Sequence, residues 1–190
     1  FASQFDVPEN LDTPPDSLAA EDRWVLAEFQ NPMHTVEEAW ANLDIYTATQ
    51  ALKTFGTGLL PSHYLEMVKS RLYDDDKAAA WTLHRIVRDF MAAFSPVCPF
   101  FTHHISSTVY ETSAVDVDAF PSPPLAEVAY GSEEGGRLCS LSHGLQEFNG
   151  QTWGKKKDAG ISLNQPIEGV SIPEELEEFA STLARMHQLV

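Results

Sequence analysis

The stretch YLEMVKSRLYDDDKAAAW, residues 64–81, decides the fold. Its apolar side chains recur every three or four residues, which is the spacing of one helix face. These side chains are Tyr64, Leu65, Val68 and Leu72. The triplet Asp74–Asp76 then suits the start of a second helix, where carboxylates cap backbone N–H groups and complement the helix dipole. A calcium loop would also need a glycine and a terminal glutamate, which are missing here. The stretch therefore predicts two helices joined by an aspartate turn.

Similar helical patterns flank this stretch on its N-terminal side. Asp16 or Ser17 can cap a helix that runs to about Phe29, and Asn31-Pro32 is expected to end it. The capping box Thr35-x-x-Glu38 then predicts a long helix to about residue 57. Gly56 and Gly58 are expected to end or bend that helix, and Pro61 fits the first position of the next one.

The C-terminal side is more mixed. The helix after Asp76 is predicted to reach about Ser95, and Pro99 starts another that ends near Glu111. Residues 137–157 predict a further helix, ISLNQPIEGVSI (161–172) alternates as a strand does, and Pro173 opens a last helix. The expected fold class is mainly α. An antiparallel helical bundle (1–111) is followed by a Pro/Gly-rich connector (112–136) and a small α/β appendage (137–190).

The net charge of this 190-residue chain is −16, with 28 acidic residues against 12 Lys and Arg. Such a balance ordinarily argues against nucleic acid, because phosphate contacts need cations. Proteins that work in molar salt also carry acidic surfaces, since a Debye length of about 3 Å screens the repulsion. The acids are scattered along the whole chain and form no single tail. This distribution favours a protein from a salt-loving organism.

The sequence carries no recognisable catalytic site. It has no glycine-flanked serine elbow, no phosphate-binding loop and no dinucleotide fingerprint. His103 and His104 are adjacent, so they diverge by about 100° on a helix and make poor joint metal ligands. No apolar run approaches the roughly 20 residues that a membrane span needs. We therefore expect no metal and no cofactor in this chain. The sequence opens inside an apolar phrase and without Met, so we interpret it as a piece of a longer protein.

The few basic and the less regular aromatic residues are the candidates for contact with RNA. The candidates are Lys53, Lys69, Arg71, Tyr73, Arg85, Arg88, Trp153, Lys155, Lys156 and Lys157. Lys69 and Arg71 are expected to project outward, although either can instead pair with a surface acid such as Glu66. The lysine run can contact phosphate or merely complement a helix dipole. Tyr73 and Trp153 can stack on bases or pack in the core.

Four phrases in order resemble one known family. They are AEDRWVLAEF (20–29), ALKTF (51–55), HYLEMVKSRLY (63–73) and AFSPVCPFFTHHIS (93–106). This order is similar to the region that follows the catalytic core in class I aminoacyl-tRNA synthetases of the valyl, isoleucyl and leucyl group. The resemblance covers residues 1–111 well and extends more loosely to 190 through KKKDAGISLNQPIEGVSI (155–172), which favours the valyl type. The family often carries an acid at the position of His103. The helix before the lysine run is also richer in glycine here than in the family.

The resemblance implies an anticodon-binding domain. Its partners would be a tRNA, with the valine acceptor preferred, and the catalytic domain of the same protein, which would use ATP and Mg²⁺. It also implies a cytoplasmic protein that acts as a monomer and binds neither DNA nor membranes. The isoleucyl or leucyl type stays open as an alternative. So does a helical protein-interaction module without an RNA role, which the charge of −16 favours. A stand-alone enzyme is disfavoured because no catalytic site is recognisable.

Overall fold

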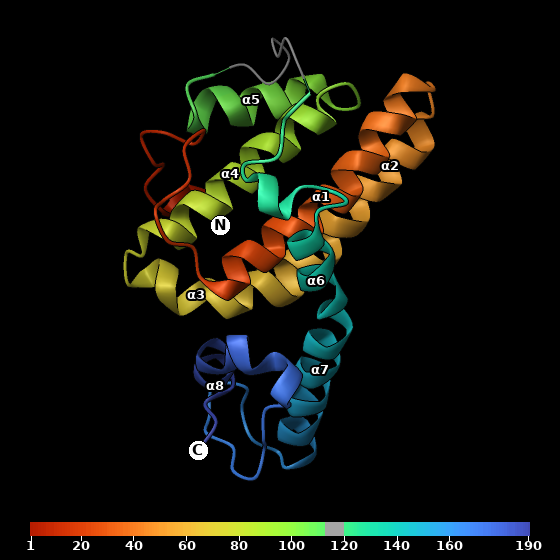
Figure 1. The fold of residues 1–190 in the computed structure, drawn as a ribbon. Helices are drawn as coiled ribbons and strands as arrows, with labels where there is room; N and C mark the ends of the chain where they lie inside the picture. The colour runs from red at the N-terminus through yellow and green to blue at the C-terminus, as the bar shows by residue number, and fades with distance from the viewer. Residues whose placement is uncertain (113–119) are drawn as a thin grey trace.

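The computed structural model describes residues 1–112 and 120–190 of the chain. Within these ranges the chain is built from helices, and its one β-type pairing is a single bridge between Ile167 and Leu189. Figure 1 shows a bundle of long helices above a smaller unit that contains α8 and much of α7. Across the described ranges, no helix combines the length and the apolar character needed to cross a lipid bilayer.

The helical elements follow one another with short connections. In chain order they are η1 (Ala2–Gln4), α1 (Ala20–Ala41), α2 (Ile45–Thr54), η2 (Phe55–Tyr64), α3 (Leu65–Tyr73), α4 (Lys77–Phe94), α5 (Pro99–Val109), η3 (Ala126–Val128), α6 (Glu133–Ser140), α7 (Ser142–Asp158), η4 (Glu174–Phe179) and α8 (Ala180–His187). The segment η2 is a π-helix, and η1, η3 and η4 are 3₁₀ turns.

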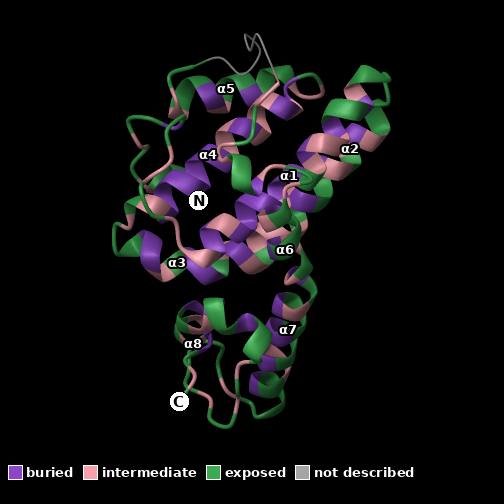
Figure 2. Ribbon diagram, viewed as in Figure 1, coloured by how far each residue is buried: buried purple, intermediate pink, exposed green. Residues whose placement is uncertain are grey.

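Three long rods make up the bundle. Helix α1 ends at a turn, and the continuous run α2–η2–α3 returns along it, while α4 packs against both (Figure 1). Figure 2 shows the buried faces of these rods turned toward one another. Large side chains fill the space between them, which removes apolar surface from water and stabilises the arrangement. Those that are fully buried include Trp24, Phe29, Leu52, Tyr64, Leu72, Leu83 and Ile86.

The aspartate turn after α3 has the predicted capping role. The Asp76 carboxylate accepts hydrogen bonds from the backbone N–H groups of Ala78 and Ala79, at 2.9 and 3.1 Å. Asp75 adopts a left-handed backbone conformation with φ of 58°, which aspartate tolerates better than most residues. The turn reverses the chain, so that α4 packs back against α3. The predicted inward positions of Tyr64, Val68 and Leu72 are confirmed, and Leu65 is half-buried.

The predicted break at Asn31-Pro32 is wrong. Helix α1 continues through Pro32 and ends nine residues later, at Ala41. The buried side chains of Phe29, Met33 and Val36 lie on both sides of the proline, so their packing holds the helix together across it. The reversal occurs instead at Leu43, which has φ of 57°, and Asp44 then caps α2 through the N–H of Thr47.

The glycines after α2 do not end the helix either. From Phe55 to Tyr64 the chain widens into a π-helix that joins α2 to α3 without a break, although it contains Pro61. Gly56 lies where a Cβ atom would be only 3.1 Å from the ring of Phe90 on α4. The absence of a side chain there lets the two helices approach closely, which is a packing reason for this glycine.

The predicted α/β appendage is also wrong in the described ranges, because residues 161–172 form no strand. Among the described residues, its only β-type pairing is the bridge between Ile167 and Leu189. Residues 137–157 divide between α6 and α7, and the last helix starts as the 3₁₀ turn η4 before α8. The expected connector, 112–136, falls partly on residues 113–119, which lie outside the described residues; its later part contains η3 and the start of α6.

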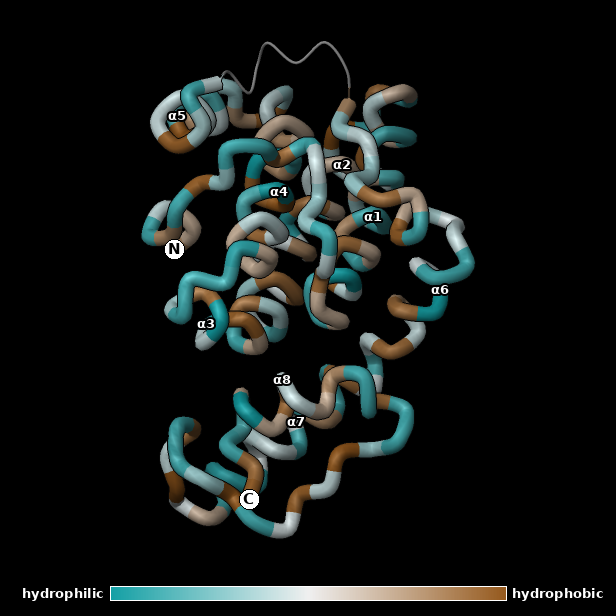
Figure 3. Tube along the Cα trace, turned by 60° about the vertical axis from the view of Figure 1, so that its left-hand side comes forward, coloured by the Kyte–Doolittle hydropathy of each residue, from teal (hydrophilic) through white to brown (hydrophobic). Residues whose placement is uncertain are grey.

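The C-terminal helices are fastened to the bundle by buried polar contacts. Trp24 Nε1 donates to Ser142 Oγ at 2.8 Å, which joins the start of α7 to α1. Thr182 Oγ1 in α8 donates to Glu21 Oε1 in α1 at 2.9 Å. Apolar side chains of the C-terminal segment, including Leu145, Leu176 and Phe179, are buried as well. Figure 3, from another side, shows α7 and α8 together below the bundle.

Candidate nucleic-acid interface

Arg71 lies in a buried ion network, and the prediction that it projects outward is wrong. Its guanidinium donates to Asp76, Glu21 and Asp22, at 2.8, 2.7 and 2.7 Å. Burial lowers the pKa of this group, but hydrogen bonds to Asp22 and Asp76 outweigh it and raise the pKa above its usual value. Tyr64 adds a hydrogen bond from its hydroxyl to Asp22 at 3.0 Å. The network ties α1 to α3 and leaves Arg71 unavailable to a tRNA phosphate.

Arg85 is likewise a structural residue. It is buried, with Nε donating to Asp89 at 2.6 Å and the other nitrogens to the carbonyls of Leu11 and Ser122, at 3.2 and 2.7 Å. It therefore holds the N-terminal loop and the segment after residue 120 onto α4. The predicted RNA contact through Arg85 does not fit this burial.

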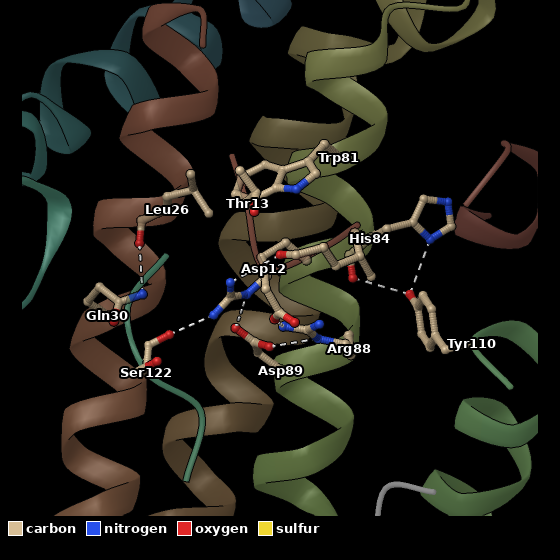
Figure 4. Close-up of polar contacts among 12 residues, drawn as sticks. Asp12, Thr13, Leu26, Gln30, Trp81, His84, Arg88, Asp89, Tyr110 and Ser122 are labelled. Atoms are coloured by element: carbon tan, nitrogen blue, oxygen red, sulfur yellow. Dashed lines mark hydrogen bonds and ion pairs between the residues drawn. The ribbon is translucent and has the colours of Figure 1, made fainter. Parts of the chain in front are cut away.

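Arg88 lies at the edge of the same cluster and is partly exposed. It donates to Asp12 at 2.8 Å and to Asp89 at 3.3 Å (Figure 4). Asp12 is itself well exposed, so this pair is accessible to solvent. An exposed pair of this kind contributes only about 0–1 kcal/mol to stability. Arg88 therefore stays a candidate for phosphate contact.

Lys156 is the member of the lysine run that the structure buries. Its ammonium group donates to the carbonyls of Leu163 and Gln165, at 2.6 and 2.8 Å. These bonds take the place of the β-ladder expected for the following segment, because they satisfy backbone carbonyls that would otherwise need a neighbouring strand. Burial lowers the pKa of Lys156. Only Lys155 and Lys157 of the triplet are exposed and free to face a polyanion.

The remaining candidates lie on the surface. Lys53 and Lys69 are exposed, and Lys69 lies 3.5 Å from Glu66, the surface pairing that the sequence left open. Tyr73 is 61% exposed, with its ring edge-on to Phe5. These residues come from α2 and α3, whereas Lys155 and Lys157 come from α7. The structure therefore distributes the exposed candidates over several elements.

Trp153 belongs to a cluster that joins α7, α8 and η2. Its ring lies between those of His63 and His187, with centroids 5.9 and 5.6 Å away. Asn149 bridges the two histidines, accepting from His187 Nε2 at 2.8 Å and contacting His63 Nδ1 at 3.2 Å. Burial, and then the charge of Lys156, lower the pKa of His187 to about 4. Trp153 thus packs against two imidazoles and is only partly exposed.

A groove of about 760 Å³ opens between α1, α2, η2 and α7. Most of its lining side chains are neutral and can form hydrogen bonds. They are Asn31, Thr35, Tyr46, Thr47, Gln50, Thr54, Ser62, His63 and Gln146. The lining includes no Lys or Arg among the described residues, and its one carboxylate, Glu28, accepts a hydrogen bond from Ser142. We refer to this concavity as the polar groove.

Sequence reasoning missed the polar groove. Its walls come from α1, from the α2–η2 run and from α7, and Gln50 and Gln146 are almost one hundred positions apart. Each of these residues is an ordinary polar position on the outer side of an amphipathic helix. No local motif marks such a set, because only the packing of the three elements brings its members to one concavity.

Comparison with known proteins agrees with this fold. A family model for the anticodon-binding domain of tRNA ligases matches residues 22–171. Valine–tRNA ligase of Saccharolobus solfataricus is 29% identical over 164 residues, which cover 86% of this chain and 19% of that protein. Those of Aeropyrum pernix and Pyrobaculum aerophilum are 27% and 30% identical, covering 99% and 90% of the chain and 23% and 22% of each protein.

The chain thus spans about a fifth of the length of these curated relatives. The family match includes α1 from its first turn, the three rods of the bundle and all of α6 and α7. It therefore takes in both walls of the polar groove and, of the cluster around Trp153, the residues of η2 and α7 but not His187. This chain belongs to the family of anticodon-binding domains of tRNA ligases.

Proposed function

We propose that this chain is the anticodon-recognition module of a valine–tRNA ligase. In the proposed enzyme, the module binds tRNA while a separate catalytic domain uses ATP and Mg²⁺ to attach valine. The observation that carries the proposal is the match of residues 22–171 to the anticodon-binding family, together with relatives that are valine–tRNA ligases from several archaea. We place the proposed enzyme in the cytoplasm, as a monomer.

The proposed contact with tRNA uses few cations. Lys53, Lys69, Lys155 and Lys157 are the exposed candidates, and Arg88 is the partly exposed one. Log affinity falls with log salt in proportion to the number of phosphates neutralised, so a chain with so few available cations should show a shallow salt dependence. Recognition then relies mainly on stacking and on hydrogen bonds to base edges, for which Tyr73 and Trp153 are candidates.

The test is binding of the 190-residue chain to valine tRNA in molar KCl, followed by the fluorescence of its four tryptophans. A matched transcript with a changed third anticodon base, the position at which valine, isoleucine and leucine tRNAs differ, is titrated beside it. Loss of binding on that change supports anticodon reading and the valine assignment. Equal binding to both transcripts argues for the isoleucyl or leucyl type, or for recognition of tRNA shape alone. Absence of binding to either transcript favours the protein-interaction alternative.

A further inference from the structure

The polar groove lies outside every contact that the sequence predicted. We propose that it receives one unstacked base of the bound tRNA, read by Gln50 and Gln146 and stacked on Tyr46. This inference rests on the proposed function, because the base must come from a tRNA that the chain binds. At about 760 Å³ the groove falls within the range of pockets that hold ligands of nucleotide size.

The two glutamines supply the hydrogen-bonding capacity of the groove. Both line it, from α2 on one side and from α7 on the other, and both are exposed. Within residues 1–112 and 120–190, neither side-chain amide has a protein partner, whereas Gln151 on α7 donates to Glu147. An amide offers one acceptor and two donors, which complement the edge of a nucleobase. The groove therefore presents two open amides on opposite walls.

Tyr46 supplies a surface for stacking. Its side chain lines the groove and is 73% exposed, next to the turn that joins α1 to α2. Sequence-specific recognition of RNA targets unpaired bases that stack on aromatic side chains while their edges form hydrogen bonds. Tyr46 and the amides provide these two elements in one concavity. His63 is a second ring in the lining.

The charge of the groove selects the base rather than the phosphate. Phosphate contacts require cations, and no Lys or Arg among the described residues lines the groove. Glu28 would repel a phosphate placed inside. An uncharged heterocycle avoids that repulsion and leaves its phosphates outside in the solvent. Binding in the groove should therefore add affinity without adding to the salt dependence.

The experiment measures the affinity of the chain for valine tRNA at several KCl concentrations. The variants are Tyr46→Ala, Gln50→Ala and Gln146→Ala. Each should weaken binding by at least about fivefold, the lower end of what losing one base stack or base-edge contact costs. The slope of log affinity against log salt should stay as in the wild type. Matched controls are Gln151→Ala, a glutamine of α7 outside the groove, and Ile45→Ala, an exposed neighbour of Tyr46 that does not line it. Both controls should bind within about twofold of the wild type.

The possible results are distinguishable. Wild-type binding with unaffected groove variants overturns the groove inference and leaves the proposed function standing. Weaker binding with a shallower salt slope identifies a phosphate contact and also overturns it. A wild type that binds no tRNA overturns both proposals. All three substituted side chains are exposed, so the variants should melt at the same temperature as the wild type, which checks that each remains folded. In a separate experiment, 2-aminopurine is placed in turn at each anticodon-loop position. Its fluorescence should report which base loses its contact in Tyr46→Ala.

Discussion

Arg71 shows at the residue scale how burial changes the meaning of a charged side chain. On the helix pattern it falls beside Lys69, and the two look equivalent in sequence. In the structure, Lys69 is about half exposed and pairs with one surface glutamate, whereas Arg71 is surrounded by three carboxylates. Removing one partner of a buried ion pair leaves an uncompensated charge, which costs far more than losing a surface pair.

We therefore expect Arg71→Ala to lower the free energy of unfolding by about 3–5 kcal/mol. Glu21 and Asp22 would stay buried without their cation. Lys69→Ala, the control two positions away, should change stability by no more than about 1 kcal/mol. Urea unfolding of both variants in the same KCl buffer checks this. If Arg71→Ala were as stable as the wild type but bound tRNA weakly, Arg71 would be an RNA contact after all.

Helix α1 shows, at the scale of an element, how tertiary packing competes with a local sequence preference. Proline inside a helix removes one backbone hydrogen bond and crowds the carbonyl four residues earlier. Local rules therefore place a helix end before Pro32. The structure keeps one helix of 22 residues because its buried face packs against α2 and α4 along most of its length. Tertiary packing outweighs the local penalty.

This account predicts that Pro32→Ala stabilises the protein. Alanine restores the N–H donor and removes the ring, which should raise the free energy of unfolding by about 1–3 kcal/mol. Pro99→Ala is the matched control. Pro99 is the first residue of α5, where a backbone N–H has no partner within the helix, so its replacement should have little effect. Urea unfolding measures both; an unchanged or less stable Pro32→Ala would show that α1 is shaped around the proline.

At the scale of the whole molecule, the surface carries the excess negative charge. Among the described residues, the buried cations Arg71, Arg85 and Lys156 are matched in number by the buried acids Glu21, Asp22 and Asp89. The buried charges therefore sum to zero and leave the net charge of −16 unchanged. Such a surface repels itself in dilute buffer, and this repulsion opposes the compact state.

We expect the midpoint of thermal unfolding to rise when KCl is increased from dilute to molar concentration, because salt screens this repulsion. Circular dichroism at the helix band measures the midpoint, and a non-ionic solute at equal osmolality is the control for general solute effects. Melts that coincide in dilute and molar KCl would remove the inference of a salt-loving source.

Much of the helical content was predictable, because it follows from local chemistry. The Asp76 cap and the proline start of α5 rest on contacts within a few residues, and the inward face of Tyr64, Val68 and Leu72 follows from the helical period of the apolar positions. The predicted strand failed because a strand needs a partner that no local pattern can supply. The polar groove was also beyond prediction, since it joins residues from separate helices.

The sequence by itself determined the mainly helical class, the turn between α3 and α4 and the family resemblance. Each of these depends on short-range periodicity or on ordered phrases along the chain. Only the tertiary structure decided which cations are buried, that α1 passes through Pro32 and that Lys156 holds the 161–172 segment. The physical reason is that burial and ion pairing depend on neighbours distant in sequence, and the free energy of those contacts exceeds the local preferences that a sequence pattern records.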